Sequence, residues 1–82
     1  MIELKDTVNL MLSDDYKDRF SAEFQQLYIR FEKLRKMVND YKNDKLDFTP
    51  TCPLHLLEEQ LYYMNAYLTS LLNRALIEDV DV

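Results

Sequence analysis

The sequence predicts an all-α protein: a long antiparallel helical hairpin with a short N-terminal helix, assembled as a homo-oligomer. Three observations lead to this fold class. Two long stretches of the 82-residue chain repeat apolar residues at alternating steps of three and four, a proline-containing segment separates them, and the chain has no glycine. Steps of three and four place side chains on one stripe of an α-helix, whereas a strand requires alternation by two.

Residues 1–12 are expected to form a short N-terminal helix of two or three amphipathic turns. A helix of this length is not stable alone, so it must dock on another element. Its apolar residues are Ile2, Leu4, Val8, Met11 and Leu12.

The first long helix is expected over residues 15–43. Ser13, Asp14 and Asp15 lie where it begins, and their side chains can accept hydrogen bonds from the free N–H groups of a first helical turn. Their negative charge also suits the positive end of the helix dipole. The apolar stripe of this helix consists of Phe20, Phe24, Leu27, Phe31, Leu34, Val38 and Tyr41.

A proline-containing turn is expected over residues 44–53, because Pro50 and Pro53 restrict the residues before them to extended backbone. Leu46 and Phe48 are expected to pack against the end of the hairpin. The second long helix is expected over residues 53–78, followed by a loose tail over residues 79–82. The apolar stripe of this helix consists of Leu54, Leu57, Leu61, Met64, Leu68, Leu71 and Ala75.

The chain carries more apolar side chains than one seam between two helices can bury. A hairpin with a second apolar face on each helix is expected to self-associate. The alternative is that the N-terminal segment folds back over this face, but 12 residues cannot cover two helices of about 40 Å each at a rise of about 1.5 Å per residue. The surplus residues are Tyr28, Ile29, Met37, Leu56, Tyr63, Tyr67 and Leu72.

Composition argues against an enzyme. The chain has one histidine, His55, and one cysteine, Cys52, three positions apart, and it has no glycine-rich loop to hold a phosphate. We therefore expect no catalytic residue, no metal and no cofactor. The net charge of −5 argues against binding of DNA or RNA, and no apolar run is long enough to span a membrane. A soluble intracellular protein is expected.

One stretch of the chain is nevertheless basic. Residues 16–36 contain six basic and three acidic side chains, so this stretch carries +3 and the remainder −8. Arg30 and Lys33 lie three positions apart, and Lys17 lies near the expected helix start, where an anion could meet both cations and free N–H groups. Tyr16 could stack on a base there. The ordinary alternative is a solvated helix face with ion pairs at i,i+4 spacing.

Five segments of the chain form a distinctive pattern. They are YKDRFSAEFQQL from Tyr16 to Leu27, RFEKL from Arg30 to Leu34, LDFTPTCP from Leu46 to Pro53, LLEEQ from Leu56 to Gln60, and the pair Arg74-Ala75. This pattern resembles the phage anti-CBASS protein 2-like family, whose members are helical-hairpin sponges for cyclic oligonucleotide signals. The resemblance covers roughly residues 14–78, and the proline-containing turn is its most specific part.

The resemblance implies a homohexamer without enzymatic activity, made in the host cytoplasm during phage infection. It would sequester cyclic dinucleotides such as cGAMP, and cyclic trinucleotides at a separate site, so that a CBASS-type immune effector is never activated. By the same resemblance, Tyr16 stacks on the bases, Lys33 or Arg30 reaches the phosphates across a protomer boundary, and Arg74 occupies the position associated with cyclic trinucleotides.

Three functions are therefore considered. The first is the signal sponge, with Tyr16, Lys17, Arg30 and Lys33 at a protomer boundary and Arg74 at a second site. The second is a helical protein–protein interaction module or adaptor that inhibits a host protein through its spare apolar face. The third is a small phage structural or assembly factor.

Overall fold

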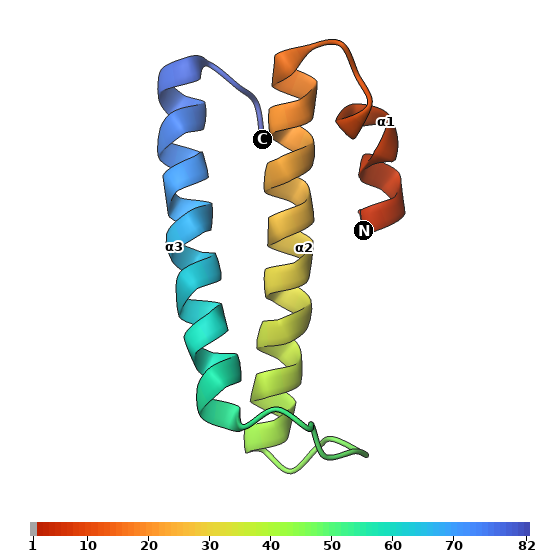
Figure 1. Cartoon of the computed structure of the whole chain (residues 1–82), viewed down its shortest axis with the longest axis vertical. Coiled ribbons are helices and arrows are strands. Elements are labelled where there is room, and N and C mark those ends of the chain that lie inside the picture. The colour runs from red at the N-terminus through yellow and green to blue at the C-terminus, as the bar shows by residue number, and fades with distance from the viewer. Residues whose placement is uncertain (1) are drawn as a thin grey trace.

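The computed structural model describes residues 2–82 and is mainly helical, with a short N-terminal segment and a long hairpin. The segment consists of a 3-10 turn, η1 (Leu4–Thr7), and a single α-helical turn, α1 (Val8–Met11). The hairpin consists of α2 (Tyr16–Lys42) and α3 (Leu54–Glu78), which run antiparallel and side by side (Figure 1). The described residues contain no strand, so the all-α hairpin expected from the sequence is confirmed.

Helix α2 begins where its capping residues predict. The Asp15 side chain accepts a hydrogen bond from the backbone N–H of Lys17 at 3.0 Å, which satisfies one of the free donors of the first turn. The Ser13 hydroxyl donates to Asp18 at 2.7 Å, and the Arg19 guanidinium donates to the Ser13 carbonyl at 2.7 Å. The loop before α2 is therefore fixed by side chains of the helix that it precedes.

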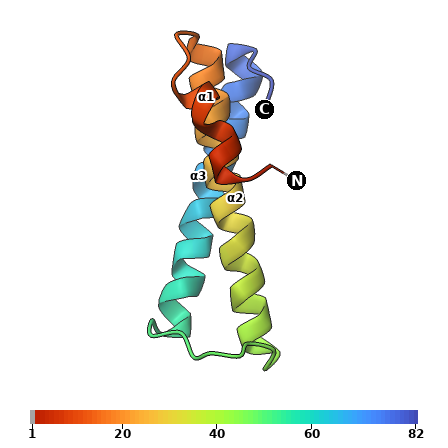
Figure 2. The same ribbon diagram turned by 90° about the vertical axis from the view of Figure 1, so that its right-hand side faces the viewer.

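The most deeply buried part of the core lies at the open end of the hairpin, away from the connecting loop. Phe20 of α2 packs there with Leu71, Ala75 and Val80, each at most 8% exposed. The stripe residues nearer the loop are mostly only half-buried, because each helix is covered by its partner on one side. Figure 2 shows α2 and α3 crossing at an angle and diverging toward the loop.

The N-terminal segment packs along α2, on the side away from α3 (Figure 1). Thr7 is completely buried, its hydroxyl donating to the Leu4 carbonyl at 2.7 Å and accepting from the Gln26 amide at 2.9 Å. The segment therefore docks by a buried polar contact as well as by apolar residues. It covers part of α2 and leaves the outer face of α3 bare.

The tail was expected to be loose, and the structure corrects this. Val80 is only 8% exposed, and its N–H donates to the Ala75 carbonyl at 2.9 Å. Asp79 adopts the left-handed conformation (φ 58°, ψ 48°) that turns the chain back over the end of α3. The turn is what delivers Val80 to the core.

The connecting loop also differs from expectation in one position. Leu46 is half-buried, as an apolar residue near the hairpin end should be, but Phe48 is 55% exposed. The diverging ends of α2 and α3 offer no complete surface against which this ring could pack.

A large apolar surface remains exposed on α3. Leu76 and Ile77 are 84% and 86% exposed, and Tyr62 is 71% exposed. Exposed apolar side chains in adjacent positions, such as Leu76 and Ile77, are typical of surfaces that bind another molecule. Among residues 2–82, no helix has the length and apolar character needed to cross a membrane.

Candidate functional site

The first turn of α2 and the last turn of α3 meet at the open end of the hairpin, and they place Tyr16, Arg74 and Glu78 in mutual contact. A terminal nitrogen of Arg74 donates to the Tyr16 hydroxyl at 2.6 Å, and that hydroxyl donates to Oε1 of Glu78 at 2.6 Å. Arg74 Nε donates to Oε2 of Glu78 at 2.8 Å. We call these three residues the end cluster.

Arg74 only donates in the end cluster, Glu78 only accepts, and Tyr16 does both. The phenol of Tyr16 has a single proton, which it gives to Glu78, while it accepts from Arg74. Both carboxylate oxygens of Glu78 are occupied, one by each partner. The cluster is thus a closed ring of three residues contributed by two helices.

The Phe20 ring packs against two residues of the end cluster, Arg74 and Tyr16. The guanidinium carbon of Arg74 lies 4.8 Å from the centroid of this buried ring, within the range of a cation–π contact. The rings of Tyr16 and Phe20 meet edge to face with centroids 6.1 Å apart. Tyr16 nevertheless stays 47% exposed, so part of its ring is open to a ligand.

Lys17 lies beside the cluster and holds the start of the tail. Its ammonium group donates to the backbone carbonyl of Asp79 at 2.9 Å. The end of the hairpin therefore carries two cations, Lys17 and Arg74, next to one exposed aromatic ring. Such a combination suits a ligand that has both flat bases and phosphates.

The protonation of the cluster follows from its hydrogen bonds. The pKa of Glu78 lies below its ordinary value of 4.5, because Arg74 first and Tyr16 second donate to its carboxylate. The pKa of Tyr16 is raised above its ordinary value of 10.0, chiefly by the bond to Glu78 and then by loss of solvent around the phenol. At neutral pH the cluster therefore contains a carboxylate, a neutral phenol and a guanidinium.

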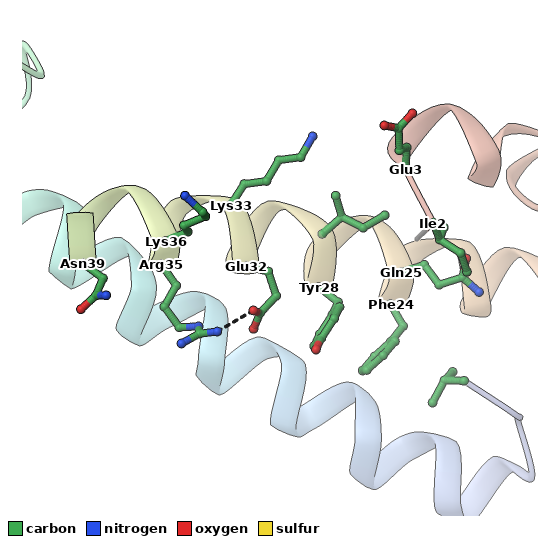
Figure 3. Close-up of a pocket in the computed structure, with 12 residues that line it drawn as sticks. Ile2, Glu3, Phe24, Gln25, Tyr28, Glu32, Lys33, Arg35, Lys36 and Asn39 are labelled. Carbon is green, nitrogen blue, oxygen red and sulfur yellow. Dashed lines mark hydrogen bonds and ion pairs between the residues drawn. The ribbon is translucent and has the colours of Figure 1, made fainter. Parts of the chain in front are cut away.

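Lys33 belongs to a different region, a groove of about 760 Å³ along α2 (Figure 3). The rings of Phe24 and Tyr28 are stacked on one side of this groove, with centroids 6.2 Å apart. Lys33 points away from these rings, toward the N-terminal segment (Figure 3). The Arg35 guanidinium also lines the groove and is paired with Glu32 at 2.6 Å.

Arg30 and Lys33 are not brought to the end cluster within one chain. Arg30 is 14 positions beyond Tyr16 on the same helix and Lys33 is 17 beyond it, which places them about 21 and 26 Å away along the axis at a rise of about 1.5 Å per residue. Arg30 is exposed and does not line the groove. Of the five residues predicted for ligand binding, the structure unites Tyr16, Lys17 and Arg74.

Sequence reasoning missed one residue of the end cluster, Glu78. The signal was present, because Arg74 and Glu78 stand at i,i+4 spacing, which brings side chains together on a helix. The contact of this pair with Tyr16 depends on the register of the two helices, which the spacing alone does not give. Cys52 and His55 are exposed, and residues 2–82 contain no group of side chains arranged to hold a metal.

A scan against protein-family models matches residues 14–77 to the family described as Sequestin. Comparison with curated proteins gives no match, and comparison with solved structures gives none either. The match covers α2, the proline-containing turn and all of α3 except its last residue, so it includes Tyr16 and Arg74 of the end cluster but not Glu78. Sequestin proteins bind and sequester small signalling molecules and are not known as enzymes. The chain therefore belongs to the Sequestin family, the family of anti-CBASS sponges for cyclic oligonucleotides that the hairpin and its proline turn resemble.

Proposed function

We propose that this chain is a phage anti-defence protein that binds host cyclic oligonucleotide second messengers and so prevents activation of a CBASS-type immune effector. Its ligands are cyclic dinucleotides, cGAMP among them, with cyclic trinucleotides as a second class. It acts in the host cytoplasm by sequestration, which requires tight binding and enough copies but no turnover.

The observation that carries this proposal is the contact between Tyr16 and Arg74. An exposed aromatic ring can stack on a base, and a guanidinium beside it can pair with a phosphate through two of its nitrogens. Lys17 supplies a second cation at the same end of the hairpin. A net acidic protein can hold an anionic ligand in this way because the field that matters is local.

A complete site requires a second copy of the chain. Lys33 and Arg30 lie too far from Tyr16 to reach the same small ligand within one protomer, so they contribute from a neighbouring one. The symmetry of a homo-oligomer also suits a ligand with two equivalent phosphates, because it presents the same residues twice. We propose the homohexamer that the family resemblance implies.

Calorimetric titration tests the proposal directly. The purified protein should bind 3′,3′-cGAMP or another member of a panel of cyclic di- and trinucleotides with a micromolar or lower dissociation constant. The ligand recovered after heat denaturation should be chemically unchanged, as expected of a sponge. Absence of binding to every member of the panel, by a folded protein, would contradict the proposal.

A matched pair of variants links binding to the site. Tyr16→Ala removes the ring at the end of the hairpin and should abolish most of the affinity. Tyr62→Ala removes a more exposed ring, 71% accessible, from the half of α3 nearer the connecting loop. This variant should leave the affinity for cyclic nucleotides unchanged. Equal losses in the two variants would place the ligand elsewhere.

The apolar surface around Leu76 and Ile77 favours a second candidate, a helical adaptor that inhibits a host protein. Side chains 84% and 86% exposed could anchor a partner protein as readily as another copy of the chain. This alternative predicts a host protein recovered in stoichiometric amount with the chain, in a complex that survives Tyr16→Ala. It also predicts no binding of cyclic nucleotides.

A further inference from the structure

We propose that Glu78 controls the affinity and charge selectivity of the site, because in the ligand-free chain its carboxylate occupies the groups that a ligand phosphate would take. This inference rests on the proposed function. It goes beyond that function by assigning a role to an acidic residue in a site that binds anions. It also makes Tyr16 and Arg74 parts of one site.

The geometry of the contacts is the first argument. Glu78 uses one oxygen for the Tyr16 hydroxyl and the other for Arg74 Nε, at 2.6 and 2.8 Å. The two non-bridging oxygens of a phosphodiester can accept the same two hydrogen bonds. The carboxylate therefore stands where such a phosphate would bind, and the ligand must displace it.

The second argument is that Glu78 is weakly held. The Arg74 side chain is 50% exposed and that of Glu78 is 32% exposed, and ion pairs at i,i+4 spacing in such surroundings are weak and screened by salt. Glu78 is also the last residue of α3, where the negative end of the helix dipole opposes a carboxylate. Its removal from the cluster is therefore inexpensive.

Arg74 would remain in place when Glu78 leaves. Its guanidinium lies over the buried Phe20 ring at 4.8 Å, and this contact does not involve the carboxylate. The Tyr16 ring also touches Phe20 edge to face. The two recognition groups are thus positioned by the core, whereas Glu78, which competes for them, is held by exposed hydrogen bonds.

Two consequences follow for the ligands. An uncharged molecule such as adenosine can stack on Tyr16 without displacing Glu78 from Arg74, so the carboxylate lowers the affinity of phosphate ligands and leaves that of adenosine nearly unchanged. A phosphate that displaces Glu78 from Arg74 also frees the Tyr16 hydroxyl, because one carboxylate holds both. Binding of a ligand to Arg74 and binding of a ligand to Tyr16 are therefore coupled through Glu78.

The test compares the wild type with Glu78→Gln, Glu78→Ala and a control, Glu59→Gln, by calorimetric titration with 3′,3′-cGAMP, cyclic triadenylate and adenosine. Glu59 is an exposed carboxylate of the same helix, 19 positions from Glu78 and about 28 Å away along the axis. Both Glu78 variants should bind at least one of the two cyclic nucleotides about two- to fivefold more tightly than the wild type, as loss of an exposed ion pair implies. Adenosine should gain no comparable advantage, and Glu59→Gln should resemble the wild type.

The outcomes separate this inference from the function on which it rests. If the wild type binds neither cyclic nucleotide, nor any other in the panel, the proposed function fails. If the wild type binds but both Glu78 variants bind equally or more weakly while still folded, as judged by thermal unfolding, Glu78 is a structural partner and the inference is wrong. A gain of the same size in Glu59→Gln would also overturn it, because net charge alone would then be the cause.

Discussion

The hydroxyl of Tyr16 lies 2.6 Å from a terminal nitrogen of Arg74, although the two residues are 58 positions apart in the chain. The contact arises because antiparallel packing sets the first turn of α2 against the last turn of α3. The family resemblance assigns Tyr16 and Arg74 to different ligands and separate sites. In this chain they touch, and they share the carboxylate of Glu78.

Replacing Tyr16 by phenylalanine separates the contribution of the ring from that of the hydroxyl. Tyr16→Phe keeps the aromatic face and should retain affinity for 3′,3′-cGAMP within about threefold, whereas Tyr16→Ala should lose about 10- to 100-fold, as expected when a stacked base loses its platform. Calorimetric titration measures both. A loss in Tyr16→Phe as large as that in Tyr16→Ala would show that the hydroxyl, and not stacking, dominates recognition.

The end cluster should make the stability of the protein depend on acidic pH. The pKa of Glu78 is lower in the folded chain than its ordinary value of 4.5, because Arg74 and Tyr16 donate to the carboxylate. Its contribution is therefore fully present above pH 4.5 and is lost as the pH falls through the lower, folded value.

Thermal unfolding at a series of pH values checks this dependence. The difference in melting temperature between the wild type and Glu78→Gln should be constant above pH 5 and should shrink below pH 4.5, because the carboxylate of the wild type becomes protonated. Glu59→Gln serves as the control and should show no such convergence. A wild-type advantage that grows as the pH falls would contradict the assignment of the lowered pKa.

The core at the open end of the hairpin should be sensitive to truncation. Leu71 is 1% exposed and packs with Phe20, so Leu71→Ala should reduce the free energy of unfolding by about 2–5 kcal/mol. The neighbouring Leu72 is 45% exposed, and Leu72→Ala should cost less than about 1 kcal/mol. Urea unfolding at a fixed protein concentration measures both values. Similar losses at the two positions would mean that Leu72 is buried by another copy of the chain.

Self-association should depend on the bare face of α3. Leu76→Glu and Ile77→Glu introduce charge where the side chains are 84% and 86% exposed, and each should dissociate the oligomer if this face joins protomers. Thr51→Glu, in the exposed connecting loop, should leave the assembly intact. Sedimentation velocity distinguishes these results. A wild type that remains a folded monomer at high concentration would contradict the prediction of a homo-oligomer and, with it, a site shared between protomers.

The helices could be predicted from the sequence because their apolar periodicity is strict. The stripe from Leu54 to Ala75 is half-buried or buried at every position, and α2 begins directly after its capping residue, Asp15. The tail could not be predicted from its composition. Val80 is one apolar residue between two aspartates. Its burial depends on the left-handed turn at Asp79, which the spacing of apolar residues does not predict.

The candidate site could be predicted only in part, for a physical reason. Tyr16 and Lys17 are adjacent in sequence, and Arg74 stands out as the only basic residue after position 45. Their meeting depends on the register between helices, which is set by the packing of Phe20 against Leu71 and Ala75. Arg30 and Lys33 have the same charge as the other cations, but they lie far from the end cluster because α2 rises along its axis between Tyr16 and these residues.

The long-range closure of the end cluster also determines when a chain that is being synthesised can form the candidate site. Tyr16 leaves the ribosome early, but its partners Arg74 and Glu78 are among the last residues of α3 to be synthesised. A product of premature termination would hold the aromatic ring and most of the basic residues and still lack the closed cluster. The candidate site can therefore close only after the last turn of α3 has been synthesised.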